Sequence, residues 1–208
     1  MADQRSRTMT ARQPDEAASA NQNAVREERR GPVRLRLTAA LALGALVAET
    51  IGVLERYMVA TPHPVPDYHP FFSDPFYMKA WLASATVVLA CGQLMTAAGM
   101  FGLFHLSGSR FYNFMHRWSG RIAMALTLPV AFNCLFDLGL NAPDTRILIH
   151  ATLGALIYGV FTAKVLLVRQ ARTPGWLLAL AGSALFIVIL GLWLTSAYWL
   201  FALYGVHL

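Results

Sequence analysis

Two histidines in apolar stretches of this chain each stand four residues before a glycine, His116 in the segment HRWSG and His150 in the segment HATLG. Residues four apart lie on the same face of a helix, so each glycine leaves a recess one turn from an imidazole. A flat macrocycle can pack into such a recess, and imidazole is a common axial ligand of haem iron. Both histidines are therefore candidates for binding haem b or a quinone. The alternative is that each is a hydrated or backbone-bonded histidine near the membrane surface.

Five further polar side chains lie within the apolar stretches or at their ends: Glu49, Gln93, Asn133, Asp137 and Arg146. A carboxylate at membrane depth is costly and normally has a partner or a function, so Glu49 has a functional and a structural interpretation. Gln93 lies in the middle of its stretch and is expected to hydrogen-bond a neighbouring helix.

Residue counting along the chain predicts how deep these side chains lie. Counted outward from the turn between the third and fourth stretches, His150 is level with Asn133, which is one helical turn from Asp137. Glu49 and Arg146 are expected at a similar depth. The sequence therefore predicts a pocket near one membrane surface, formed by Glu49, Asn133, Asp137, Arg146 and His150. The other histidine belongs near the opposite surface, about 25 Å away at about 1.5 Å per residue. The two histidines therefore cannot ligate one haem together.

The elements that must position these residues are five apolar stretches, roughly residues 37–54, 77–104, 111–138, 147–168 and 176–202. Apolar residues make up 56% of the 208, charged residues only 13%, and the mean hydropathy is +0.47. A helix of about 20 apolar residues spans the hydrocarbon core of a bilayer. The chain is therefore predicted to be an all-α integral membrane protein, an antiparallel bundle of five transmembrane helices surrounded by the lipid bilayer. As such it is expected to be a multi-pass protein of the cell membrane.

The charges predict the orientation of this bundle. Most basic residues fall in the amino-terminal segment and on the same side of the later stretches, which predicts an N-terminus inside and a C-terminus outside. Residues 1–36 are polar and rich in arginine, and they are predicted to form a disordered basic cytoplasmic tail ahead of a transmembrane domain at 37–204. No aromatic residue interleaves these arginines, so nucleic acid is not an expected partner. The external loop at 57–76 contains five prolines and is predicted to be an ordered lid or a docking loop.

The sequence lacks the short motifs of several enzyme classes. It contains no Walker loop, nucleophile elbow, HExxH motif or CxxC-type zinc pattern. Hydrolysis and phosphoryl transfer are therefore disfavoured. Cys91 and Cys134 lie in different stretches and at different expected depths, so no disulfide is expected between them.

Four sequence blocks, HRWSGR, DTR-hhhH (h, apolar), GVFTAK and GLWLTS, resemble an uncharacterised family of actinobacterial membrane proteins with five predicted helices. The resemblance covers roughly Tyr77 to Trp199. In that family the residue matching Asn133 is often histidine, which would face His150 and imply a bis-imidazole haem site. This chain has Asn133 there, and an asparagine is no ordinary axial ligand. In a looser way the helices with histidines near their ends resemble haem-b membrane cytochromes of the ferric-reductase and ascorbate-linked kinds.

Two hypotheses of function follow from these residues. The leading one is an integral membrane electron-transfer component that binds haem b or a quinone through His150, His116 or both. The alternative is a non-enzymatic membrane subunit or scaffold, whose external loop docks a redox protein outside the cytoplasm. Whether the protein is itself an enzyme stays open.

Overall fold

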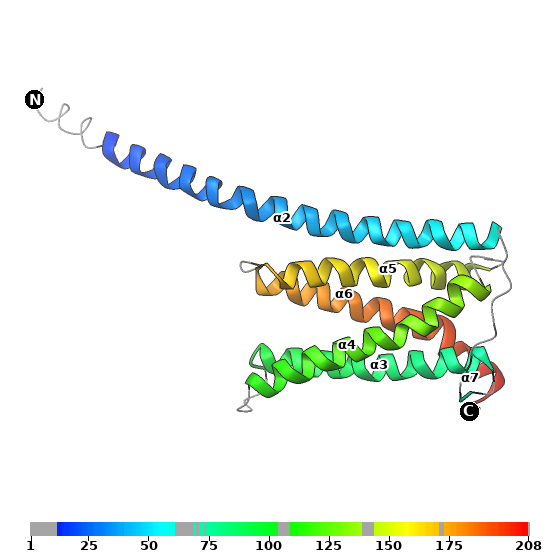
Figure 1. Ribbon diagram of the computed structural model, residues 1–208. Coiled ribbons are helices and arrows are strands. Elements are labelled where there is room, and N and C mark those ends of the chain that lie inside the picture. The colour runs from blue at the N-terminus through cyan, green and yellow to red at the C-terminus, as the bar shows by residue number, and fades with distance from the viewer. Residues whose placement is uncertain are drawn as a thin grey trace, which may run out of the picture.

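The computed structural model describes residues 12–60, 69, 71–72, 74–103, 109–138, 144–170 and 173–207, without the side chains of residues 12–33, 59, 109, 137 and 138. All regular secondary structure in these ranges is helical (Figure 1). Two of the elements, η1 and η2, are π-helices that continue the α-helix before them. In chain order the elements are α2 (Arg12–Ala60), α3 (Pro75–Met100), α4 (Ser109–Asn133), η1 (Cys134–Leu138), α5 (Thr145–Val168), α6 (Gly175–Trp193), η2 (Leu194–Tyr198) and α7 (Trp199–Tyr204).

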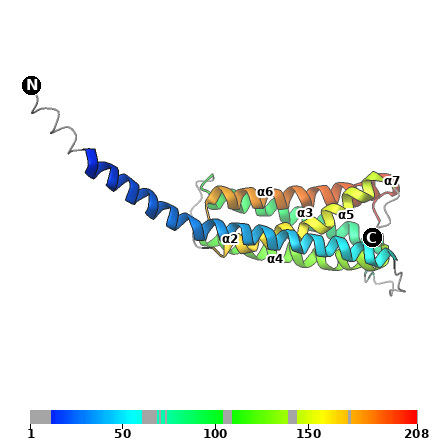
Figure 2. The same cartoon turned by 90° about the horizontal axis from the view of Figure 1, so that it is seen from above.

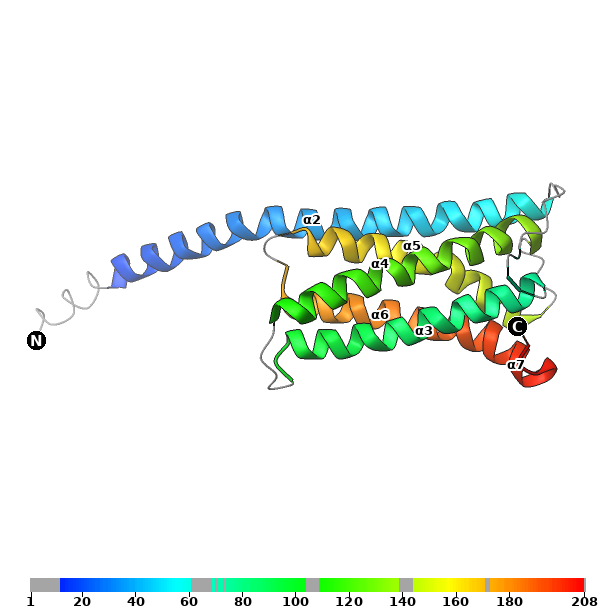
Figure 3. The same cartoon turned by 60° about the horizontal axis from the view of Figure 1, so that its bottom comes forward.

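Five helical segments of the described chain are long and apolar enough to cross a membrane: Arg34–Met58, Pro75–Met100, Arg110–Phe136, Thr145–Val168 and Gly175–Tyr204. They coincide with the five predicted stretches, so the all-α prediction and the number of helices long and apolar enough to cross a membrane are confirmed. Successive helices run in opposite directions along one common axis (Figures 1 and 3). The end where α3 and α5 begin is called the His150 end below, and the end where α4 begins is called the His116 end. The predicted orientation places the His150 end outside the cell.

Two aspartates fix where helices begin at the His150 end. Asp74 Oδ1 accepts hydrogen bonds from the backbone nitrogens of Phe76 and Tyr77 at 2.7 and 2.9 Å. Asp144 Oδ1 accepts one from the backbone nitrogen of Ile147 at 2.9 Å. Such N-caps satisfy backbone donors that have no partner within the helix, and each contributes about 1 kcal/mol. They therefore set the register of α3 and α5 at this end.

Small residues let α2 approach α5 closely. A Cβ atom added to Gly44 would lie 2.6 Å from the carbonyl oxygen of Gly159, and one added to Gly159 would lie 2.5 Å from the carbonyl oxygen of Gly44. Ala48 and Ala163 flank the same contact. Backbone-to-backbone packing of this kind is typical of membrane helices, where dispersion forces drive association.

The remaining helices leave a space at the His150 end. A core of Ala90, Ile157, Leu185, Val188 and Ile189 joins α3, α5 and α6. The main packing of α4 is on α3, whereas α5 packs on α2 and α6. Because α4 and α5 have little direct contact, the side chains between them do not close the bundle completely.

Helix α2 differs from the prediction at its amino-terminal half. The structure is helical from Arg12, whereas residues 1–36 were expected to be disordered; residues 1–11 lie outside the described part. This half of α2 extends well past the ends of the other helices (Figure 2). Low apolar content explains why it does not pack on the bundle, but alanine, glutamate and arginine are good helix formers even without packing. The predicted loop at 57–76 is shorter in the structure, because α2 continues to Ala60 and α3 begins at Pro75.

Candidate functional site

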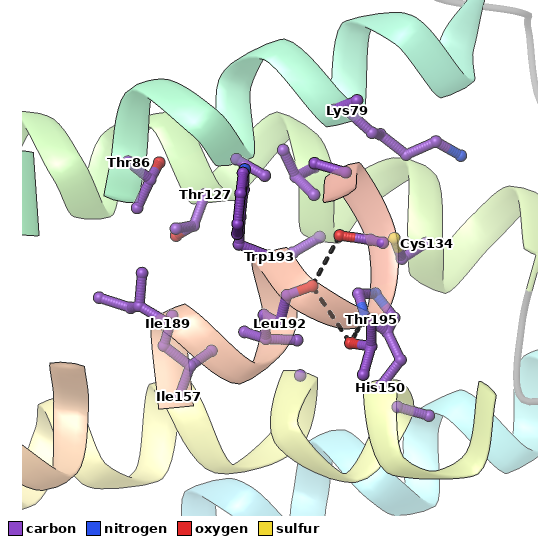
Figure 4. A pocket seen from close by; sticks show the side chains of 18 of the residues that line it. Lys79, Thr86, Thr127, Cys134, His150, Ile157, Ile189, Leu192, Trp193 and Thr195 are labelled. Carbon is purple, nitrogen blue, oxygen red and sulfur yellow. Dashed lines mark hydrogen bonds between the residues drawn. The ribbon is translucent and has the colours of Figure 1, made fainter. Parts of the chain in front are cut away.

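A cavity of about 450 Å³ lies inside the bundle at the His150 end. Figure 4 shows Lys79, Cys134 and His150 toward one end of it and Thr86, Thr127, Ile157 and Ile189 toward the other. Helices α2 to α7 and both π-helices contribute lining residues, most of which are apolar. The charged side chains of the lining are Glu55, Lys79 and Arg146. The cavity is therefore lined mostly by apolar residues, and its charged side chains lie at the His150 end.

The imidazole of His150 is held in one orientation by η2. Its Nδ1 lies 2.9 Å from Thr195 Oγ1, and this hydroxyl donates its own proton to the carbonyl oxygen of Gly191 at 2.8 Å. A hydroxyl has one proton, so when Thr195 donates to the Gly191 carbonyl, or to that of Leu192 at 3.2 Å, Nδ1 carries the hydrogen in the bond to Thr195. That arrangement corresponds to the Nδ1–H tautomer of neutral His150, in which Nε2 is the basic nitrogen.

Lys79 places an amine at the cavity without a hydrogen-bond partner among the described residues. Its side chain is only 7% exposed, and Nζ is the one fully buried side-chain nitrogen or oxygen without a hydrogen bond in the described part of the chain. Nζ lies 4.6 Å from the ring centroid of Phe76, which also lines the cavity. An unpaired buried amine is unfavourable, so this position is one where a hydrogen-bond acceptor would bind favourably.

Arg146, in contrast, is engaged by the protein itself. Its Nη1 donates to the backbone oxygen of Thr195 at 2.8 Å, and its guanidinium carbon lies 3.9 Å from the ring centroid of Trp199. Nη2 lies 4.0 Å from Asp144 Oδ2 at the start of α5. Arg146 therefore fixes η2 and α7 against α5 and so helps to hold Thr195 beside His150.

Both π-helices open onto this cavity. Cys134 and Leu135 of η1 and Thr195 and Ser196 of η2 are lining residues. A π-helix widens the turn and rotates the side chains that follow, and such segments often occur at functional sites. After α4 the π-helix η1 begins five residues beyond Pro129, which has no backbone N–H to donate within the helix.

The two histidine–glycine motifs differ in the space beside the glycine. A Cβ atom on Gly154 would meet only Glu55 Oε1, at 3.7 Å, so this recess opens onto the cavity. A Cβ atom on Gly120 would lie 3.1 Å from Gln93 Oε1. The side chain of Gln93 therefore fills the recess beside His116, and only the His150 motif retains the predicted space.

At the His116 end the polar side chains bond one another. Gln93 Nε2 donates to the backbone oxygen of His116 at 2.5 Å and to Ser119 Oγ at 2.6 Å, so the expected cross-helix bond is present. Nδ1 of His116 lies 3.0 Å from Thr96 Oγ1, which donates to the carbonyl oxygen of Gly92 at 2.8 Å. This cluster joins α3 to α4.

The structure brings together part of the predicted pocket. Arg146 and His150 line the cavity. Asn133, which was predicted to line it, does not, but its neighbour Cys134 does. Asn133 itself is 4% exposed, and its Nδ2 donates to the carbonyl oxygen of Pro129 at 3.0 Å. Glu49 lies on the exposed surface of α2 instead, and the side chain of Asp137 is outside the described part.

Four lining residues that the sequence analysis did not identify have a spacing that carries a signal: Ile51, Glu55, Lys79 and Thr86. One face of α2 packs on α5 and carries residues at intervals of four, three and four: Gly44, Ala48, Ile51 and Glu55. Glu49 lies off this stripe, whereas Glu55 lies on it and reaches the cavity. Lys79 and Thr86 are likewise seven residues apart on one face of α3.

The chain matches the family of unknown function DUF6529 over residues 37–208. It belongs to this family. The match covers almost all of the five segments of the DUF6529 chain that are long and apolar enough to cross a membrane, and it agrees with the predicted membership of an uncharacterised family. No curated protein and no solved structure matches the chain significantly, so the expected likeness to haem-b cytochromes is not shown.

Proposed function

We propose that this DUF6529 protein is a membrane electron-transfer component that binds the head group of a quinone in the cavity beside His150. The observation that carries the proposal is the amine of Lys79, which has no hydrogen-bond acceptor among the described residues, at a cavity that also contains the imidazole of His150. A quinone carries carbonyl oxygens on a flat apolar ring, and the amine supplies a donor for one of them. The ring and the start of an apolar tail suit the apolar lining.

The size and position of the cavity support a small lipophilic ligand. Its volume of about 450 Å³ falls in the range of about 300–1,000 Å³ that is usual for small-molecule sites. It lies between helices that are long enough to cross a membrane, so a ligand dissolved in lipid can reach it without entering water. The few polar groups converge at one end, as they do in sites that orient a head group.

Haem b fits the described donors less well than a quinone. His150 is the one histidine among the lining residues, and Asn133 uses its amide nitrogen on Pro129. The described residues contain no group of three His, Cys, Asp or Glu side chains arranged to hold a metal ion. A bis-imidazole site therefore lacks its second ligand in the cavity. A Soret band after haem reconstitution, lost on His150→Ala, would support haem b instead.

The test is the binding of a short-tailed benzoquinone to the full-length protein in lipid nanodiscs, measured by calorimetry. Lys79→Met should weaken binding about tenfold or more, because a hydrogen bond from a charged donor contributes about 1.5–3 kcal/mol. The same variant should raise the free energy of unfolding by about 1–3 kcal/mol, because it removes a buried amine without a partner.

Lys164→Met is the matched control, since Lys164 is the only other lysine of the chain and does not line the cavity. It should bind the quinone as the native protein does. Absence of saturable binding to the native protein, or equal binding by Lys79→Met, would refute the proposal.

One observation favours the alternative of a subunit or scaffold. The carboxylate of Glu49 is exposed on the surface of α2, within a segment long and apolar enough to cross a membrane. Such a group normally has a partner, which here would be a polar or basic side chain of another membrane helix. A stoichiometric partner that co-purifies with the native protein but not with Glu49→Leu would support this alternative.

A further inference from the structure

Most polar side chains that line the cavity already use their protons within the protein. The hydroxyls of Thr86, Thr127 and Ser196 donate to backbone carbonyls of their own helices at 2.7–2.8 Å. The indole nitrogen of Trp193 donates to Ser84 Oγ at 2.9 Å. These groups hold the wall together and are poor partners for a ligand.

Two groups at the His150 end offer complementary hydrogen bonds. Lys79 Nζ has protons to donate and no acceptor among the described residues. When the Thr195 hydroxyl donates to the Gly191 carbonyl, His150 donates to that hydroxyl through Nδ1, and Nε2 of His150 is then an acceptor. The site thus presents one donor and one acceptor, rather than two donors.

This pairing discriminates between the two redox forms of a quinone. The oxidised form has carbonyl oxygens, which accept hydrogen bonds but cannot donate them to Nε2. The reduced form has hydroxyl groups, which can donate to Nε2 at one end and accept from Lys79 at the other. To meet a carbonyl oxygen, His150 would have to shift its proton to Nε2, and Thr195 would then have to turn its hydroxyl away from Gly191.

We infer that the cavity binds the quinol form of its ligand more tightly than the quinone form, with His150 Nε2 accepting a quinol hydroxyl and Thr195 fixing the tautomer. This inference rests on the proposed function and names the redox form that the site selects. Thr195 is a positioning residue, since it acts on the ligand through the imidazole. Tighter binding of the reduced form also raises the midpoint potential of the bound couple, by about 30 mV for each tenfold difference in affinity.

The experiment measures dissociation constants for one short-tailed benzoquinone and for its hydroquinone, with full-length protein in lipid nanodiscs. For the native protein we expect the hydroquinone to bind about tenfold more tightly, and a redox titration of the bound ligand to show the matching shift of about 30 mV. Thr195→Val removes the hydroxyl at nearly constant shape and should bring the two constants together. Thr195→Ser keeps the hydroxyl and should restore the preference.

The outcomes separate the preference for the reduced form from the binding of a quinone as such. Equal constants in the native protein, or tighter binding of the oxidised form, would overturn the tautomer preference and leave quinone binding in place. A preference that persists unchanged in Thr195→Val would also overturn it. If neither form binds, the proposed function fails and this inference fails with it. If Thr195→Val does not fold, the native constants and the redox titration decide the matter alone.

Discussion

Two glycines of α5 that lie five residues apart should respond in opposite ways to the same substitution. Gly154 faces the cavity, where an added Cβ atom meets only Glu55 Oε1 at 3.7 Å. Gly159 faces α2, where an added Cβ atom would lie 2.5 Å from the carbonyl oxygen of Gly44 and 2.8 Å from the Cβ of Ala48. The first site has room for a methyl group, whereas the second would force two backbones apart.

The expected magnitude follows from comparing the two variants with each other. Replacing glycine by alanine in a helix interior gains about 0.5–1 kcal/mol, and this gain is shared by Gly154→Ala and Gly159→Ala. Overpacking at a tight contact costs about 1–3 kcal/mol, and only Gly159→Ala incurs it. The shared gain cancels in the comparison, so Gly159→Ala should be less stable than Gly154→Ala by about 1–3 kcal/mol.

The assay is reversible unfolding of the full-length protein in mixed micelles with increasing SDS, followed by circular dichroism. Gly154→Ala should be as stable as the native protein or more stable. Equal stabilities of the two variants, or a more stable Gly159→Ala, would refute the packing of α2 on α5 through Gly44. A double variant with Gly44→Ala tests the same contact, because its effect should not be additive with that of Gly159→Ala.

Two other substitutions test the cavity and the opposite end of the bundle. Gly154→Leu should leave the fold intact but extend a side chain into the cavity, so that calorimetry shows benzoquinone binding weakened about tenfold or more, with Gly154→Ala as the control. Gln93→Leu should lower the free energy of unfolding in SDS by about 1 kcal/mol, because it removes the bonds to the His116 carbonyl and Ser119 without touching the cavity, and benzoquinone binding should be unchanged.

The five apolar helices could be predicted from the sequence because the signals are local, although α2 is longer at both ends than predicted. A run of apolar residues predicts a membrane-crossing helix, and Asp74 and Asp144 stand where α3 and α5 begin. Counting along antiparallel helices also placed His150 and Arg146 at one end, as the structure does. Depth along the membrane normal is thus accessible from residue number alone.

Rotation of each helix about its axis was harder to predict. Glu49 and Glu55 are six residues apart on α2, and which of them faces the cavity depends on the contact of Gly44 with α5. Cys134 and Thr195 face the cavity from π-helices, whose wider turn departs from the regular period of 3.6 residues. Sequence reasoning that assumes this period places Asn133 in the pocket, although the structure bonds it to Pro129.

Helix α2 forms one wall of the cavity through Ile51 and Glu55, and it is attached to the bundle chiefly along α5. The contact between α2 and α5 at Gly44 is made by glycine and alanine residues, without large side chains between the two backbones. Displacement of α2 would therefore open the cavity without disturbing the packing of α3 on α4 or of α5 on α6.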